Sequence, residues 1–337
     1  MKFVTYKRAG EDRLGLYHKS RVYDLQDAGT QLGLVLPSTI LEYLNSNEKF
    51  YPLALKINKE ILNDKIEYFF EEDQVKLLAP VPHPTSCRDG YAFRQHAESA
   101  RRIRGLEMIQ EFDQFPVFYF SNHNAVFGEG NIYVEDDHLQ KLDFELEAAV
   151  VIGRKGKNIQ AEEADSFIAG YMIMNDFSAR KLQSDEMKLN LGPAKGKDFA
   201  TAFGPWLVTT DELEEFKILS AAGARYSLKM KAYHNGKLIS EGNLKDMNWT
   251  FAEIIERASY GAELLPGDVI GSGTVGTGCY LELNGTRALE AKVRGEDFRP
   301  VWLLGGDTIE LEITGLGRLK NKIVRTQHSY SILSKKK

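Results

Sequence analysis

Two glutamates that alternate along an apolar segment are the strongest chemical feature of the chain. In the run Asp143-Phe144-Glu145-Leu146-Glu147, strand geometry would point Glu145 and Glu147 to the same face. Two carboxylates on one face repel each other unless water or a cation neutralises them. Such hard oxygen ligands suit Mg²⁺, Ca²⁺ or Mn²⁺. An exposed strand edge is the alternative, but the apolar AAVVIG that follows predicts burial.

Two aspartates and one histidine add further chemistry. Asp176 comes just after the apolar run GYMIM at 170–174, where a buried strand would end; a helix N-cap is an equally good interpretation. Asp89 lies in RDGYAFRQHAESARR, and an Asp-Gly pair alone usually indicates only a turn. His96 follows in the same segment among several arginines, and a surface position on a basic helix is its alternative. Taken singly, none of these residues identifies a site.

The elements that must position these residues are mostly short strands. Residues 1–80 form one predicted unit, with strands at its start and a helical stretch at 39–62. Prolines at 80, 82 and 84 mark a boundary, so the second predicted unit spans 81–337. It begins with helical composition at 92–112 and continues with apolar strands and glycine turns, among which we expect YLEL at 280–283 to be a strand. The pattern predicts a β-rich α+β fold rather than a doubly wound α/β fold.

Composition excludes several classes of protein. The 337 residues carry a net charge of -5, from 48 acidic and 43 basic side chains, so the chain lacks a strong field that would attract nucleic acid. Two cysteines are too few for a disulfide framework. The sequence contains no signal-peptide-like start and no apolar run of about 18 residues. We therefore expect a cytoplasmic protein that acts on a small molecule, without a nucleic-acid or membrane partner.

A glycine-rich segment, GSGTVG at 271–276, matches the dinucleotide fingerprint GxGxxG. That fingerprint needs a helix N-terminus to bind the pyrophosphate. Here Thr277-Gly278-Cys279 and the expected strand YLEL follow, so a turn that lines a pocket is the better interpretation. Cys279 is not expected to act as a nucleophile, because no histidine lies close to it in sequence.

Five blocks, in order, resemble the fumarylacetoacetate hydrolase family. They are RDGYAFRQHA, FELEAAVVIG, GYMIMNDFSARKLQ, GPAKGKDFATAFGPWLV, and GSGTVG followed by YLEL, and together they cover roughly residues 80–315. Each block is weak alone, whereas the ordered set is specific. The resemblance implies a mixed β-sandwich or roll catalytic domain, which a small β-barrel-like domain precedes in the long members. It also implies a homodimer.

The resemblance assigns a role to each matching residue. The ligands of one divalent cation would be Asp89, Glu145, Glu147 and Asp176, and Thr201 would contact a second, structural magnesium. The catalytic group would comprise His96, the carboxylate Glu282 that orients it, and the polar cluster of Arg180, Gln183 and Lys197. Substrate-contacting positions would be Tyr91, Tyr119 and Thr274. Without the resemblance, Lys197 would be taken for a solvated loop lysine and both tyrosines for half-buried aromatics.

Two departures from the family pattern concern the substrate. The run Tyr119-Phe120-Ser121-Asn122 stands where the human-type enzymes carry Tyr-His-Gly-Arg. The arginine expected after the catalytic histidine is not in register, and Arg101, Arg102 or Arg104 could replace it. These differences leave the identity of the substrate open.

The leading expectation is a metal-dependent hydrolase that cleaves a carbon–carbon bond in a small acidic β-diketone. Fumarylacetoacetate or an acylpyruvate would be the substrate, as in the catabolism of aromatic amino acids. The His96–Glu282 pair would take a proton from water, the cation would polarise the diketone, and the polar cluster would stabilise the oxyanion. The first alternative is a decarboxylase, hydratase or isomerase that acts on an oxo-acid at the same site. The second is a non-catalytic binding protein; a nucleotide-binding oxidoreductase would rest only on the glycine-rich segment.

Overall fold

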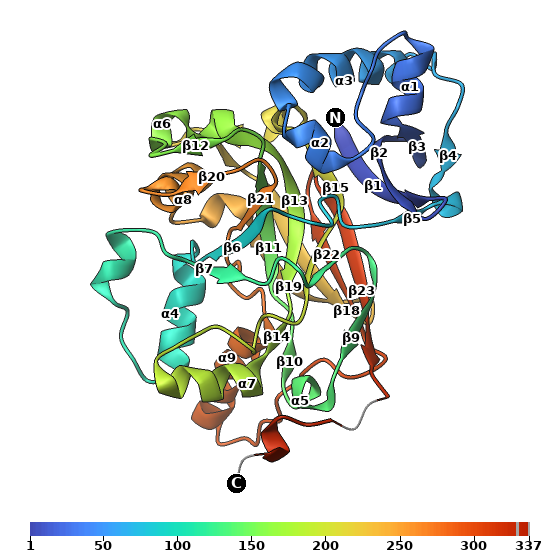
Figure 1. Ribbon diagram of the computed structural model, residues 1–337. Coiled ribbons are helices and arrows are strands. Elements are labelled where there is room, and N and C mark those ends of the chain that lie inside the picture. Colours follow the sequence, from blue (N-terminus) through green and yellow to red (C-terminus); the bar gives the residue numbers. More distant parts are fainter. Residues whose placement is uncertain (328–329, 336–337) are drawn as a thin grey trace.

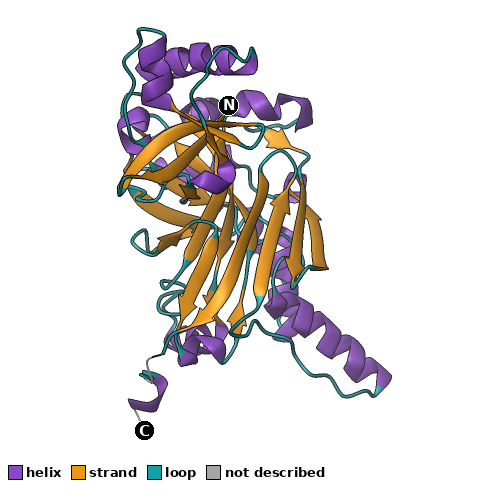
Figure 2. Ribbon diagram, turned by 90° about the vertical axis from the view of Figure 1, so that its right-hand side faces the viewer, coloured by secondary structure: helices purple, strands orange, loops and turns teal. Residues whose placement is uncertain are grey.

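Two β-sheets form the centre of the computed structural model, which describes residues 1–327 and 330–335 (Figure 1). Among these residues the larger sheet has twelve strands, in the order β4-β3-β2-β1-β15-β13-β11-β21-β6-β7, with β5 paired to β1 and β8 to β15. The smaller sheet has the order β19-β18-β22-β23-β9. Strands occupy the middle of the molecule and helices gather at its two ends (Figure 2). The predicted β-rich α+β fold is confirmed.

The bounds of the elements are as follows. The larger sheet contains β1 (Lys2–Arg8), β2 (Glu11–His18), β3 (Arg21–Asp24), β4 (Phe70–Glu71), β5 (Lys76–Leu77), β6 (Ser86–Gly90), β7 (Phe118–Ser121), β8 (Val126–Phe127), β11 (Leu146–Ile152), β13 (Ile168–Asp176), β15 (Thr201–Val208) and β21 (Asp268–Gly271). The smaller sheet contains β9 (Gly130–Val134), β18 (Lys229–His234), β19 (Lys237–Asn243), β22 (Thr308–Ile313) and β23 (Gly317–Arg325). Short pairs are β10 (Leu142–Asp143) with β14 (Ser178–Ala179), β12 (Gly156–Lys157) with β20 (Glu263–Leu264), and β16 (Lys217–Ile218) with β17 (Arg225–Tyr226). The α-helices are α1 (Leu25–Gln31), α2 (Ile40–Leu44), α3 (Asn47–Leu62), α4 (Arg94–Ile103), α5 (Asp136–Leu139), α6 (Ala161–Ala164), α7 (Arg180–Glu186), α8 (Phe251–Ser259) and α9 (Tyr280–Arg294).

The central strands of the larger sheet are apolar along most of their length because both of their faces are covered. On one face, Val150 of β11 packs in a single cluster with Ile309 and Leu311 of β22, which come from the smaller sheet. On the other face, Val151 and Met172 join a second cluster with β1, β2 and helices α1 to α3. A strand that is buried on both faces loses the alternation of apolar and polar residues, which explains the continuous run in β11.

The strands and helices predicted in residues 1–80 are confirmed, and they extend the larger sheet. Strand β1 pairs antiparallel with β15, with Lys2 opposite Val208, so one sheet passes from the N-terminal segment into the body of the protein. Helices α1 to α3 cover this end of the sheet (Figure 1). The division into units 1–80 and 81–337 stays a prediction.

The prediction of a strand at YLEL is wrong, because these residues begin helix α9. The Asp143 carboxylate accepts hydrogen bonds from the backbone N–H groups of Tyr280 (2.7 Å) and Leu281 (2.9 Å). A carboxylate at this position satisfies N–H groups that have no partner inside the helix and complements its dipole. The residue that caps the start of α9, Asp143, therefore lies far from the helix in sequence. The local strand propensity of YLEL led to the wrong prediction. None of the described helices combines the length and the hydropathy of a membrane span.

Helices α4 and α9 pack closely together at the end of the molecule where α7 also lies (Figure 1). The contact passes over Gly285 of α9, where a Cβ atom would lie 2.2 Å from Cδ1 and 2.4 Å from Cγ1 of Ile103. A side chain at 285 would therefore displace α4 or force Ile103 out of its place. The missing side chain sets the distance between the two helices.

We predict that Gly285→Ala destabilises the protein by about 1–3 kcal/mol through overpacking, although alanine favours helix. Ile103→Ala should relieve the clash, so that the double variant is more stable than the sum of the single effects implies. Urea unfolding of the four proteins of this cycle measures the coupling. Gly305→Ala is the matched control, because its added Cβ meets its nearest atom at an ordinary 3.5 Å. Additive effects in the cycle would contradict the proposed contact.

Candidate active site

Neighbouring strands of the larger sheet bring the predicted polar residues to one end of that sheet. Asp176 of β13 pairs with Thr201 of β15, and Asp89 of β6 pairs with Tyr119 of β7. Strand β11, which carries Glu147, runs between β13 and β21. Residues on paired strands hold a fixed geometry better than residues on loops. The sheet register therefore positions most of the carboxylates.

Three carboxylates converge at this place. One oxygen each from Asp89, Glu145 and Glu147 lies within 4.8 Å of the others, and the three residues are 2%, 3% and 0% exposed. Glu147 Oε1 accepts a hydrogen bond from the hydroxyl of Thr274 at 3.2 Å. Its Oε2 atom is buried and has no hydrogen-bond partner within the described part of the chain. Such an oxygen is costly unless a cation or a proton satisfies it, and the all-oxygen donor set fits a hard divalent cation.

Asp176 lies outside this group of three and is joined to it by a lysine. Its Oδ2 atom accepts hydrogen bonds from Lys197 Nζ at 2.8 Å and from the Tyr119 hydroxyl. Lys197 also contacts the carboxylate of Glu145, so its ammonium group lies between two carboxylates. Thr201 donates to Asp176 Oδ1 at 3.4 Å. The roles of Asp176 as a metal ligand and of Thr201 beside a structural magnesium stay predictions.

The glycine-rich segment forms part of the floor of this site. A Cβ atom at Gly271 would lie 2.4 Å from Asp89 Oδ1 and 2.7 Å from the sulfur of Met174, so only glycine leaves room for the Asp89 carboxylate. The Gly273 N–H donates to the same oxygen at 3.0 Å. Strand β21 is antiparallel to β11 and parallel to β6, and α9 begins only at Tyr280. The segment is thus a turn that lines the pocket, as predicted, although a helix and not the expected strand follows it.

Burial and mutual repulsion divide the carboxyl groups into two kinds. Burial, together with Asp176, raises the pKa of Asp89 to about 7. Burial and the neighbouring Asp89 raise the pKa of Glu147 well above its usual value. Burial also opposes the charge of Glu145, but the cations Lys197 and Arg180 outweigh it and lower its pKa to about 2. A permanently charged carboxylate therefore lies beside two carboxyl groups whose protons a bound cation would help to displace.

A histidine–glutamate pair lies beside the carboxylates. His96 of α4 and Glu282 of α9 are both buried, and His96 Nδ1 lies 2.9 Å from Glu282 Oε2. The bond leaves Nε2 as the ring nitrogen that can meet a substrate, and Glu282 would stabilise the protonated ring. The rings of His96 and Tyr91 pack in a T-shaped arrangement, with ring centroids 5.7 Å apart. The structure therefore places His96 in the site rather than on the protein surface.

Asp143 is a central residue that the sequence analysis did not assign. It is fully buried, caps α9 as described above, and accepts a hydrogen bond from Arg180 Nε at 2.8 Å. Arg180 Nη2 also donates to Glu145 at 2.7 Å, and its Nη1 donates to Gln183 at 2.9 Å. The Asp143 carboxylate thus connects helix α9, which carries Glu282, to the arginine that also binds Glu145. Its partners are distant in sequence, and no local motif marks it.

The loop that carries Lys197 is held by a single glutamate. Both carboxylate oxygens of Glu186, at the end of α7, accept backbone N–H bonds from Ala194 (3.2 Å), Lys195 (2.7 Å) and Gly196 (3.1 Å). Successive N–H groups of this kind form a small anion-binding nest. The nest explains how a lysine from a loop is buried among carboxylates instead of being solvated.

A cavity of about 500 Å³ opens onto these groups. The predicted residues that line it are Asp89, Tyr91, His96, Tyr119, Glu145, Arg180, Gln183, Lys197 and Thr274. Three predicted residues lie behind this lining and are hydrogen-bonded to it, namely Glu147, Asp176 and Glu282. Thr201 lies farther from the cavity and bonds to Asp176. Arg104 lines the cavity, whereas Arg101 and Arg102 are not among its lining residues. Arg104 is therefore the best placed of the three arginines to contact a substrate.

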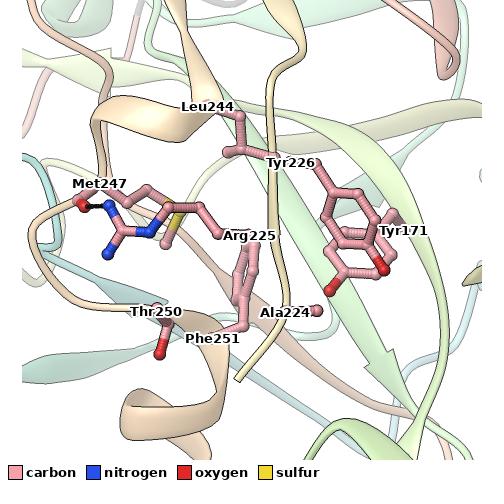
Figure 3. A pocket seen from close by; sticks show the side chains of 8 residues that line it. All are labelled: Tyr171, Ala224, Arg225, Tyr226, Leu244, Met247, Thr250 and Phe251. Carbon is pink, nitrogen blue, oxygen red and sulfur yellow. Dashed lines mark hydrogen bonds between the residues drawn. The ribbon is translucent and has the colours of Figure 1, made fainter. Parts of the chain in front are cut away.

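A second, much smaller cavity lies between β17 and α8 (Figure 3). Its volume of about 10 Å³ is roughly what one water molecule needs. The Arg225 guanidinium, the one charged group of its lining, donates to the Met247 carbonyl at 2.6 Å. The rings of Tyr171, Tyr226 and Phe251 also line it. This cavity is too small to be a substrate site.

A family model, curated proteins and solved structures all match this chain over most of its length. Residues 85–324 match the family model described as fumarylacetoacetate (FAA) hydrolase C-terminal. The oxaloacetate tautomerase YisK of Bacillus subtilis is 30% identical over 96% of this chain and all of its own length. The fumarylacetoacetase of Arabidopsis thaliana is 35% identical over 75% of this chain and 69% of its own. A fumarylacetoacetate hydrolase structure from Exiguobacterium antarcticum, 23% identical, superimposes with a TM-score of 0.66 over 97% of this chain and 100% of its own.

We predict that Asp143→Ala destabilises the protein by about 3–5 kcal/mol, because Arg180 and the N-terminus of α9 lose a buried partner. Urea unfolding monitored by circular dichroism measures the loss. Asp136→Ala is the control, since Asp136 forms a comparable arginine pair with Arg325 on the protein surface. Surface pairs contribute little, so this variant should remain close to the parent. Equal effects of the two substitutions would refute the central role of Asp143.

We also predict that Mg²⁺ binds more tightly as the pH rises through about 7. The pKa of Asp89 is raised to about 7, so below that pH Asp89 must lose a proton before the cation binds, whereas above it Asp89 is already charged. Calorimetric titrations in buffers of different ionisation enthalpy should show protons released on binding. Asp89→Asn should bind Mg²⁺ more weakly and with a flatter pH profile. A constant affinity from about pH 6 to about pH 8 would contradict the prediction.

Proposed function

Because the chain belongs to the fumarylacetoacetate hydrolase family, we propose that it is a metal-dependent tautomerase or isomerase of a small 2-oxo acid. Oxaloacetate, on which the Bacillus subtilis relative acts by its name, is the first candidate substrate. This choice revises the leading expectation from sequence, a carbon–carbon hydrolase, in favour of its first alternative. The tautomerase relative matches the chain from end to end, whereas the fumarylacetoacetase match is shorter.

The observation that carries the proposal is the buried His96–Glu282 pair beside three convergent carboxylates. Interconversion of a 2-oxo acid and its enol moves one proton between C3 and the keto oxygen. His96 would accept that proton at Nε2 and return it, while Glu282 stabilises the charged ring. A divalent cation held by Asp89, Glu145 and Glu147 would polarise the keto oxygen as a Lewis acid.

The cationic side chains would bind the acid. Lys197 and Arg104 both line the cavity, and Arg180 is held against Glu145 with its orientation set by Asp143 and Gln183. A carboxylate of the substrate needs such partners, because the site is otherwise rich in negative charge. Tyr91, Tyr119 and Thr274 supply further polar contacts along the wall. Phe120, by contrast, is 63% exposed and packs on Arg88, and neither it nor Ser121 nor Asn122 is among the residues that line the cavity.

A carbon–carbon hydrolase is the second candidate, and the size of the cavity favours it. A volume of about 500 Å³ is more than a four-carbon acid fills. It leaves room for the longer chain of a β-diketone and for the water that His96 would activate. Both reactions begin with proton transfer to the same imidazole, so the substrate decides between them.

The deciding experiment follows enol-oxaloacetate and fumarylacetoacetate, each with Mg²⁺ or EDTA. Loss of enol absorbance without new acids identifies tautomerisation, whereas chromatographic detection of two acid products identifies hydrolysis. We expect Mg²⁺-dependent tautomerisation, with kcat reduced about 10²–10⁴-fold in His96→Ala and reduced in Glu282→Gln. Glu98→Gln, on an exposed position of α4, is the control. Equal rates for parent and His96→Ala would overturn the proposal.

We also propose that the protein is a cytoplasmic homodimer with residues 1–80 as a separate unit. These three points rest on the resemblance and on the sequence pattern alone. Sedimentation velocity tests the dimer, and limited proteolysis near residue 80 tests the separate unit.

A further inference from the structure

A second group of potential metal ligands lies beside the carboxylates. His96, Cys279 and Glu282 each offer one ligand atom, and these three atoms lie within 4.8 Å of one another. All three residues are buried, and the proton transfer described above makes no use of Cys279. We propose that these residues form a site for a thiophilic metal ion such as Zn²⁺ or Cd²⁺, and that its occupation inhibits the enzyme.

The donor atoms of the two groups differ in chemical softness. Sulfur and imidazole nitrogen favour Zn²⁺ and related ions, whereas a group of carboxylates favours Mg²⁺, Ca²⁺ or Mn²⁺. Three protein ligands leave the fourth tetrahedral position for water, and His96 lines the cavity through which ion and water would enter. The two groups should therefore bind different cations at the same time.

The surroundings of Cys279 attract positive charge. Burial, with Asp143, Glu145 and Glu282 nearby, raises the pKa of its thiol. Arg180 pairs with Asp143 and Glu145 at 2.8 and 2.7 Å, so Glu282 is the carboxylate of these three that would stabilise a bound cation. Cys279 is the N-cap residue of α9, yet its side chain makes no capping hydrogen bond. The sulfur could thus bind a metal without the loss of a capping hydrogen bond.

Inhibition would follow from the identity of the bound nitrogen. His96 Nδ1 lies 2.9 Å from Glu282 Oε2, so a metal at this position takes the place of the Nδ1 proton, which moves to Nε2, and the thiol of Cys279 releases its own proton to solvent. With Nδ1 bound to the metal, the neutral ring carries its single proton on Nε2. The imidazole then has no lone pair with which to accept a proton. This step rests on the proposed function, in which His96 is the base, whereas metal binding itself does not.

Binding is tested with Co²⁺, whose thiolate complexes absorb in the near ultraviolet. Co²⁺ is titrated into the full-length protein in excess Mg²⁺, for the parent, Cys279→Ser and Cys87→Ser. Serine is a favoured N-cap residue, so Cys279→Ser should fold, and Cys279→Ala is the second variant. Cys87 is the matched control, because it is the other buried cysteine and lies outside the group. We expect the thiolate band in the parent and in Cys87→Ser only; its absence from the parent, or its persistence without Cys279, overturns the site.

Inhibition is tested with Zn²⁺ in the same three proteins, with 2-oxo acid turnover as the readout. We expect the half-inhibitory Zn²⁺ concentration to rise roughly tenfold or more in Cys279→Ser, with unchanged turnover in the absence of Zn²⁺. Inhibition that Mg²⁺ reverses and that Cys279→Ser does not alter would place Zn²⁺ on the carboxylates and overturn the proposal. A Co²⁺ band in protein that turns over none of the substrates would refute the proposed function while leaving the metal site standing.

Discussion

Repulsion among buried carboxylates is the constraint on which the rest of this structure depends. Asp89, Asp143, Glu145, Glu147 and Asp176 are all buried at one end of the larger sheet. Two buried cations, Arg180 and Lys197, offset only part of their charge, and protons or a divalent cation must offset the remainder. The arrangement is therefore costly as a structural core. Its cost is understandable as the preparation of a site that binds a cation and an acid.

Different elements carry the two halves of the site. The carboxylates come mainly from paired strands, whose hydrogen bonds fix their spacing. The proton-transfer pair comes from two helices, α4 and α9, whose distance depends on the contact at Gly285. Asp143 joins the halves, because it caps α9 and also binds Arg180. A disturbance of the helix contact would thus affect proton transfer while leaving the carboxylates in place.

Tautomerisation and carbon–carbon hydrolysis share their first requirement, which is a base beside a polarised keto group. The His96–Glu282 pair and the carboxylates meet this requirement for either reaction. What differs is whether water or a substrate carbon stands in front of the imidazole. The side chains that line the cavity determine which of the two stands there. They include Arg104 and the half-buried Tyr91 and Tyr119. Members of one family can therefore differ in reaction while they retain the same charged centre.

The fold class, most of the strands and the residues that gather at the site could be predicted from the sequence. Apolar runs and glycine turns are local signals, and the ordered motifs supplied the rest. Three features emerge only when the chain packs: YLEL begins a helix, Asp143 links both halves, and Lys197 joins Asp176 to Glu145. The physical reason is the same in each case. The deciding partners, such as Asp143 for Tyr280, lie far apart in sequence and meet only when the sheet and helices pack.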